Sequence, residues 1–103
     1  MIFEKSTTNI EQEEIPASFN LSQNYPNPFN PVTRINYSLP QTSFIKIKVF
    51  DLLGREISTL VQEQKSAGSH VVIFDGSSLG SGVYIYRMEA GNFMDTKKLL
   101  LMK

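Results

Sequence analysis

Apolar and polar residues alternate along the chain from Val32 onward, with the period of two that is typical of half-buried β-strands. The alternation is clearest in VTRINYSL at 32–39, FIKIKVF at 44–50 and VYIYRME at 83–89. Three further segments have strand character: REISTLVQ at 55–62, HVVIFD at 70–75 and FMDTKKLLLM at 93–102. Because turn signals separate the segments at intervals of about 8–12 residues, the pattern predicts an all-β domain of six or seven short strands, either a β-sandwich or a small barrel.

Small and polar residues mark the turns between these segments. Gly54 ends the run Asp51-Leu52-Leu53-Gly54 and can adopt a positive φ at little steric cost, so this run predicts a tight turn. Breaks are also predicted at 67–69, over the small-residue run 76–82, and at Ala90-Gly91-Asn92. We therefore assign turn-forming roles to six residues: Gly54, Arg55, Asp75, Gly76, Gly82 and Gly91.

Residues 24–31 (NYPNPFNP) form a proline-punctuated segment ahead of the first predicted strand. Its three prolines exclude a helix and a central strand, because proline has a fixed φ and no backbone N–H. We expect an extended edge segment that Tyr25 and Phe29 anchor on the core. At the other end of the chain, a helix over 94–103 competes with a strand, since Lys and Leu favour helices. The strand is preferred because the run is short, follows a turn and has no N-cap.

The composition indicates one globular domain, with 103 residues of which 41% are hydrophobic and 19% charged. Residues 4–14 (EKSTTNIEQEE) are polar, acidic and aperiodic, so we expect a flexible linker at 1–14 and a folded domain at 15–103. The net charge is zero, but residues 1–24 carry four Glu against one Lys, and residues 25–103 carry nine Lys or Arg against six Asp or Glu. A nucleic-acid partner usually demands a larger and more clustered basic excess, so we expect none.

Neither a membrane span nor a signal peptide is expected within the sequence. No apolar run approaches the ~18 residues that a membrane helix needs. The start, Met1-Ile2-Phe3-Glu4, lacks the basic and apolar regions of a signal peptide, which for an exported protein we expect to lie outside this sequence. The absence of cysteine excludes disulfides and thiolate metal sites.

Candidate catalytic and metal-binding residues are few. His70 is the single histidine, and a lone histidine on a strand is more often structural than catalytic. Zinc needs further histidines or cysteines, and Asp51, Asp75 and Asp95 lack the dense spacing of a calcium loop. The glycines of 76–82 are followed neither by Lys-Ser/Thr nor by a helix, so they do not form a phosphate loop. We predict no catalytic residue, no metal site and no cofactor.

The end of the chain, TKKLLLMK at 96–103, combines lysines with a run of apolar residues. One interpretation is a core strand whose lysines reach solvent, and the residues alone favour it. The other is a recognition segment, because a strand at a chain end can present its main-chain groups to a receptor. The residues concerned are Lys97, Lys98, Leu99, Leu100, Leu101, Met102 and Lys103.

An ordered series of short motifs gives the sequence a family resemblance. They are YPNPFNP at 25–31, TRINYSLP at 33–40, VFDLLGR at 49–55, LV at 60–61, AGSH at 67–70, FDG at 74–76, LGSGVYIYR at 79–87, and TKK at 96–98 with Lys103. From about Phe19 to the last residue, the sequence resembles the type A C-terminal sorting domains of type IX secretion. Phe74 stands where that family often has Trp, and Met102 where it often has Leu or Val, and both side chains remain apolar.

The resemblance implies an immunoglobulin-like antiparallel sandwich of about seven strands, similar to a domain of the flagellar hook-capping protein. Such domains end larger secreted cargo proteins, which cross the inner membrane of a Gram-negative bacterium by an N-terminal signal peptide. The domain then addresses the cargo to the outer-membrane translocon, where a shuttle protein collects it. A sortase removes the domain when the cargo is attached to the cell surface, and the cut is expected in or upstream of 4–14. By similarity, the final hairpin from Gly82 to Lys103 carries the address.

Elementary chemistry agrees with this expectation. Lys97, Lys98 and Lys103 can pair with an acidic receptor surface, which steers the encounter and sets specificity. The four apolar residues at 99–102 alternate across a strand, so one pair should fasten it to the sandwich and the other face the receptor. Gly54-Arg55 and Asp75-Gly76 are expected to fix turns rather than contact the receptor.

Two other functions are compatible with the predicted fold. A glycan-binding or spacer module of a secreted enzyme would need exposed aromatic rings, for which Tyr25, Phe29 and Phe50 are the candidates, and the chain has no Trp. A fragment of a hook-capping protein would not require the ending of two lysines, four apolar residues and a final lysine.

Overall fold

The computed structural model describes residues 15–103, and every regular element within this range is a β-strand. The strands are β1 (Asn20–Leu21), β2 (Val32–Leu39), β3 (Ser43–Phe50), β4 (Glu56–Lys65), β5 (Gly68–Asp75), β6 (Gly82–Ala90) and β7 (Phe93–Leu101). The linker expected at 1–14 lies outside the described residues.

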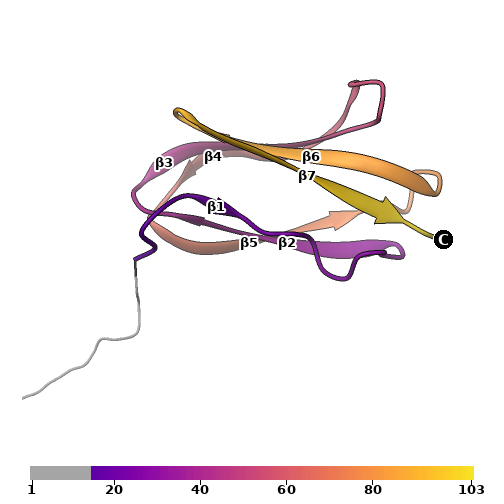
Figure 1. Cartoon of the computed structure of the whole chain (residues 1–103), viewed down its shortest axis with the longest axis horizontal. Helices are drawn as coiled ribbons and strands as arrows, with labels where there is room; N and C mark the ends of the chain where they lie inside the picture. Colours follow the sequence, from indigo (N-terminus) through magenta and orange to yellow (C-terminus); the bar gives the residue numbers. More distant parts are fainter. Residues whose placement is uncertain (1–14) are drawn as a thin grey trace, which may run out of the picture.

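The strands form two antiparallel sheets that lie face to face (Figure 1). One sheet has the order β1-β2-β5 and the other the order β4-β3-β6-β7. β4 stays paired with β3, whereas in the constant-type immunoglobulin sandwich the fourth strand belongs to the sheet of the first. The predicted all-β, immunoglobulin-like sandwich of about seven strands is confirmed. In the described residues no named strand of one sheet pairs with a named strand of the other, and only the isolated bridges Tyr25–Arg34 and Phe29–Leu101 link the proline-rich segment to both. The alternative of a small barrel is therefore wrong.

Alternate residues of the long strands fill the space between the sheets. Ile35 of β2, Ile47 of β3 and Tyr86 of β6 are completely buried, whereas the intervening Arg34 and Lys46 keep contact with solvent. Since successive side chains of a strand point to opposite faces, the period-two pattern of the sequence determines which residues form the core.

The strand boundaries differ from the predicted ones where the sequence loses its alternation. β4 runs to Lys65, three residues beyond 62, because its polar end still pairs with β3 through Ser43 and Phe44. β5 begins at Gly68, so the turn before it is Ser66-Ala67 rather than 67–69. The last segment is the strand Phe93–Leu101, and the competing helix over 94–103 is wrong.

The proline-rich segment is anchored on the core by Phe29 alone. Phe29 is 2% exposed, but Tyr25 is 74% exposed, so the expectation that both residues anchor the segment is wrong for Tyr25. The reason is the backbone pairing of Tyr25 with Arg34, in which each N–H donates to the other's carbonyl. Residues directly opposite in an antiparallel pair share a face, and Arg34 points to solvent.

Candidate functional site

β7 lies at the edge of the four-stranded sheet, and the outer edge of its last residues, from Lys98 onward, is covered. On one side β7 pairs with β6 along its whole length, from Gly82 opposite Leu101 to Ala90 opposite Phe93. On the other side it meets residues 23–31, which we call the clasp. The N–H of Phe29 donates to the carbonyl of Leu100 at 2.9 Å, and the N–H of Met102 donates to the carbonyl of Phe29 at 3.0 Å. In Figure 1 the end of β7 lies close to the segment between β1 and β2.

Two side chains of the clasp complete its contact with β7. The N–H of Leu100 donates to Asn27 Oδ1 at 3.0 Å, and Gln23 Nε2 donates to the carbonyl of Lys98 at 2.6 Å. These bonds occupy the carbonyl of Lys98, both main-chain groups of Leu100 and the N–H of Met102. A receptor therefore cannot add a strand here without displacing the clasp, and the expectation that the strand offers these main-chain groups is wrong. The side chains of β7 remain as the accessible feature.

A buried polar pair supports the clasp from inside. Asn24 and Thr33 are 2% and 1% exposed, the two buried polar residues of the described chain. Asn24 Nδ2 donates to Thr33 Oγ1 at 3.0 Å and to the carbonyl of Pro26 at 3.1 Å, and Thr33 Oγ1 donates to the same carbonyl at 2.8 Å. Neither residue stands out in the sequence as a buried polar group. The signal in the sequence is the proline run itself. Prolines have no backbone N–H to donate, so the carbonyl groups of the loop need side chains as hydrogen-bond donors.

The apolar residues at the end of β7 divide between two faces. Leu99 and Leu101 are completely buried, whereas Leu100 is half-buried and Met102 is 55% exposed. The expected alternation is thus confirmed, and the buried pair fastens the strand to the sandwich. On the outer face, Leu100 lies opposite Val83, and Lys98 opposite Ile85.

The three lysines assigned to recognition lie in three different settings. Lys98 is exposed on the outer face of β7. Lys97 points to the other face, where its Nζ lies 3.6 Å from Asp95 Oδ2. Lys103 is tied to the loop before β6, because its Nζ donates to the carbonyl of Ser77 at 2.8 Å and its N–H donates to Ser81 Oγ at 3.0 Å. The three charges are therefore not presented together.

The turn after β5 abuts the end of β7. Asp75 Oδ1 accepts the N–H of Ser77 at 2.9 Å, and this hydrogen bond is the main reason why the pKa of Asp75 is lowered. Gly76 follows, and its N–H donates to the carbonyl of Pro31 at 2.7 Å. A Cβ at Gly76 would lie 3.2 Å from Leu101 Cδ2 and 3.4 Å from the ring of Phe29. Any larger residue here would therefore crowd the side chains of Phe29 and Leu101, where the clasp meets β7.

The loop between β3 and β4 is organised by one carboxylate. Asp51 Oδ1 accepts the N–H groups of Leu53 and Arg55, both at 2.9 Å, and Oδ2 accepts Arg55 Nε at 2.7 Å. The bond from the Arg55 N–H is the largest cause of the lowered pKa of Asp51. Gly54 has a φ of 87°, a conformation that favours glycine. The remaining two of the six assigned residues, Gly82 and Gly91, lie at the start of β6 and in the β6–β7 turn.

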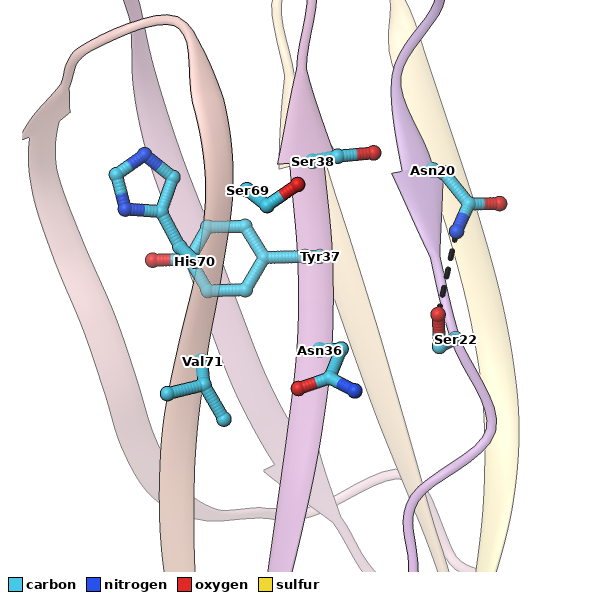
Figure 2. Close-up of a pocket in the computed structure, with 8 residues that line it drawn as sticks. All are labelled: Asn20, Ser22, Asn36, Tyr37, Ser38, Ser69, His70 and Val71. Atoms are coloured by element: carbon cyan, nitrogen blue, oxygen red, sulfur yellow. Dashed lines mark hydrogen bonds between the residues drawn. The ribbon is translucent and has the colours of Figure 1, made fainter. Parts of the chain in front are cut away.

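A shallow hollow of about 460 Å³ lies on the sheet β1-β2-β5 (Figure 2). Short polar side chains line it: Asn20, Ser22, Asn36, Ser38 and Ser69, with Tyr37, His70 and Val71. Tyr37 offers no open ring face, because it is 2% exposed and stacks on His70 with ring centroids 5.4 Å apart. A ring nitrogen of His70 is hydrogen-bonded to the carbonyl of Ser66 at 2.8 Å. Within residues 15–103, no three His, Asp or Glu side chains gather as a metal site would require.

The aromatic residues considered for glycan binding form no platform. Phe29 is buried, and the Arg87 guanidinium lies over the ring of Phe50 at 4.6 Å. Tyr25 alone of the three is widely exposed. These three residues therefore do not form a glycan-binding surface of stacked rings.

The family model described as the secretion system C-terminal sorting domain matches residues 23–102, from the first residue of the clasp to the end of the last strand. The chain belongs to this family. The sorting domain is thus a C-terminal signal of type IX secretion, which implies export to the cell surface or extracellular space of a Gram-negative bacterium. Its family is one of sorting signals rather than enzymes. No curated protein matches the sequence. In the described part of the chain, no helix has the length and apolar character to cross a membrane.

Proposed function

We propose that the sorting domain delivers a cargo protein fused upstream of it to the type IX translocon, and that its receptor reads the outer face of β7. The observation that carries the proposal is the clasp. Because the clasp occupies the outer main-chain edge of residues 98–102, side chains are what this strand can offer a partner. Lys98, Leu100 and Met102 are the side chains that point outward here.

The seven residues assigned to recognition take three roles in this proposal. Leu99 and Leu101 do not contact the receptor; they are buried in the core and fix the position of β7. Lys98, Leu100 and Met102 contact the receptor, the lysine by charge and the other two by apolar area. Lys97 and Lys103 are engaged within the domain, with Asp95 and Ser77, and they position the ends of the segment.

The finer steps of export are part of the same proposal. The exposed outer face suits an outer-membrane shuttle protein, which would collect the folded domain with its cargo. A sortase would then cut in or upstream of 4–14 and attach the cargo at the cell surface. The composition of 4–14 supports this, because ten of its eleven residues are polar or charged, and proteases cut preferentially in segments of such composition.

The test is a secretion assay. Residues 1–103 are fused behind a signal peptide and a fluorescent protein in a Gram-negative host with an active type IX system. One variant carries Lys98→Glu and Leu100→Ser, and the matched control carries Arg34→Glu on the exposed face of the opposite sheet. We expect fluorescence outside the cell for the parent and the control, and periplasmic retention of the folded double variant. Retention of the parent would refute the sorting function, and export of the double variant would refute the assigned face.

A further inference from the structure

The loop between β3 and β4 holds two leucines in solvent. Leu52 is 64% exposed and Leu53 is 80% exposed, the largest exposed fraction among the large hydrophobic residues of the described chain. We call this pair the leucine tip. Figure 1 shows the β3–β4 connection projecting beyond the body of the sandwich. Turns usually carry polar residues or glycine, so two exposed leucines at a projecting loop are not explained by the fold.

The leucine tip is held in a defined conformation. Asp51 accepts hydrogen bonds from Leu53 N–H, Arg55 N–H and Arg55 Nε, and the N–H of Gly54 donates to the carbonyl of Asp51 at 3.0 Å. Four hydrogen bonds thus hold the five residues 51–55 in one conformation, so the leucines extend from a preformed loop. A preformed loop loses little conformational entropy when a partner covers it.

A hollow connects the leucine tip with the last strand. Its volume is about 330 Å³. The lining includes Phe50, Leu52, Ile85, Arg87 and Thr96. Ile85 lies directly opposite Lys98, and Arg87 directly opposite Thr96, on neighbouring strands. The leucine tip, the hollow and the outer face of β7 therefore form one continuous surface.

Charge on this surface indicates the chemistry of its partner. Its outward residues on the four strands include four cations and two anions, a net charge of +2. The cations are Lys46, Lys48, Arg87 and Lys98, and the anions are Glu56 and Glu89. Two of the cations are already balanced, since Lys48 pairs with Glu56 and Arg87 with Glu89. Lys46 and Lys98 have no ion-pair partner within residues 15–103, so an acidic partner surface is complementary.

We propose that the leucine tip is a second anchor for the receptor that reads β7, and that it inserts into an apolar socket with an acidic rim on that receptor. The proposal rests on the proposed function, and it adds a contact that the last strand alone does not provide. A fixed apolar anchor next to a charged face is the arrangement in which a few residues supply most of the binding energy. A second copy of this chain and a lipid surface are the competing occupants of the leucine tip, and the experiment separates them.

The experiment uses the secretion fusion of residues 1–103. The test variant carries Leu52→Ser and Leu53→Ser, and a rescue variant carries Leu52→Met and Leu53→Met, which keep the apolar area. The matched control carries Val71→Ser and Ile73→Ser, which are 48% and 55% exposed on β5 in the other sheet. We expect export of the Ser tip variant to fall at least about tenfold, with the melting temperature of the purified domain unchanged. The Met variant and the β5 control should be exported like the parent.

Each other outcome overturns the proposal in a recognisable way. Normal export of the Ser tip variant removes the second anchor and leaves the sorting function intact. Failure of the parent fusion to leave the periplasm removes the sorting function, and the anchor with it. A dimer of the purified domain that the Ser variant loses, seen by sedimentation, would make the leucine tip a self-association surface. Loss of binding to phospholipid and lipopolysaccharide vesicles in the Ser variant would make it a lipid contact.

Discussion

Phe29 lies beside Leu101 in a parallel bridge, and its main chain forms hydrogen bonds on both sides of that residue, to Leu100 and to Met102. The ring of Phe29 is buried and meets the ring of Phe74 edge to face at 6.0 Å. One residue therefore supplies both the backbone pairing and the core packing that hold the clasp on β7.

Replacing Phe29 should cost far more stability than replacing Tyr25 in the same proline-rich segment. We expect Phe29→Ala to lower the free energy of unfolding by about 3–5 kcal/mol, because it empties a packed site between the sheets. Tyr25→Ala should stay within about 0.5 kcal/mol, since the ring is exposed. Urea denaturation of residues 1–103 measures both values. Equal losses would contradict the assignment of Phe29 as the anchor.

Adding one methyl group at Gly76 should disturb the end of β7. We expect Gly76→Ala to destabilise the domain by about 1–3 kcal/mol, because the new Cβ would press on Leu101 and Phe29. Gly80→Ala is the control, because a Cβ there meets nothing within 4 Å. In a double-mutant cycle measured by thermal unfolding, Leu101→Val should recover part of the Gly76→Ala loss. Additive losses would show that the contact does not matter.

Tyr86 should titrate well above the ordinary pKa of a tyrosine. Burial raises its pKa to about 12, and its hydroxyl donates to the carbonyl of Ser22 at 2.6 Å. Because the folded pKa lies above the ordinary value of 10.0, the stabilising contribution is complete below pH 10 and is lost as the pH rises through 12. Tyrosinate absorbance should show a step near pH 12 that Tyr86→Phe removes. The same variant should lose about 1 kcal/mol at neutral pH, where the Ser22 carbonyl loses its donor.

Asp51 should stabilise the β3–β4 loop in a pH-dependent way. Its folded pKa is lowered below the ordinary value of 3.8, so its contribution is present above that pH and is lost as the pH falls through the folded pKa. We expect Asp51→Asn to lower the melting temperature at neutral pH and to approach the parent in strong acid. A difference that stayed constant with pH would show that the charge of Asp51 plays no part.

The long strands could be predicted because their chemistry is local. From Arg34 in β2 and from Ile45 in β3, apolar and polar residues alternate, and burial follows that alternation over 34–39 and 45–49. β1 has two residues, too few for a pattern, and the polar end of β4 is a strand through pairing with β3. Tyr25 and Phe29 look alike in sequence. They differ because the bridge from Tyr25 to Arg34 turns one ring outward, which no local pattern reveals.

The sequence predicts which residues form the candidate site and which face each one lies on, but not the contacts that surround them. Alternation alone separates Leu99 and Leu101 from Leu100 and Met102, and it also puts Lys97 and Lys98 on opposite faces. The contacts of Asn27 with Leu100 and of Lys103 with Ser77 join residues far apart in the chain, so they depend on the assembled sandwich. The exposed Leu52 and Leu53 looked like ordinary apolar residues of a turn.

The clasp also determines when, during synthesis, the outer face of β7 can be presented to a receptor. A C-terminal domain is the last part of its protein to be synthesised, and β7 is the last strand of this domain. The clasp is synthesised early in the domain, before six of its seven strands, so it cannot pair with β7 until translation is nearly complete. In the proposed role, a cargo whose synthesis stopped early, or whose end was trimmed by a protease, has no β7 to dock. In that role the receptor can bind the outer face of β7 only on a polypeptide that has been synthesised to its end and whose sorting domain has folded.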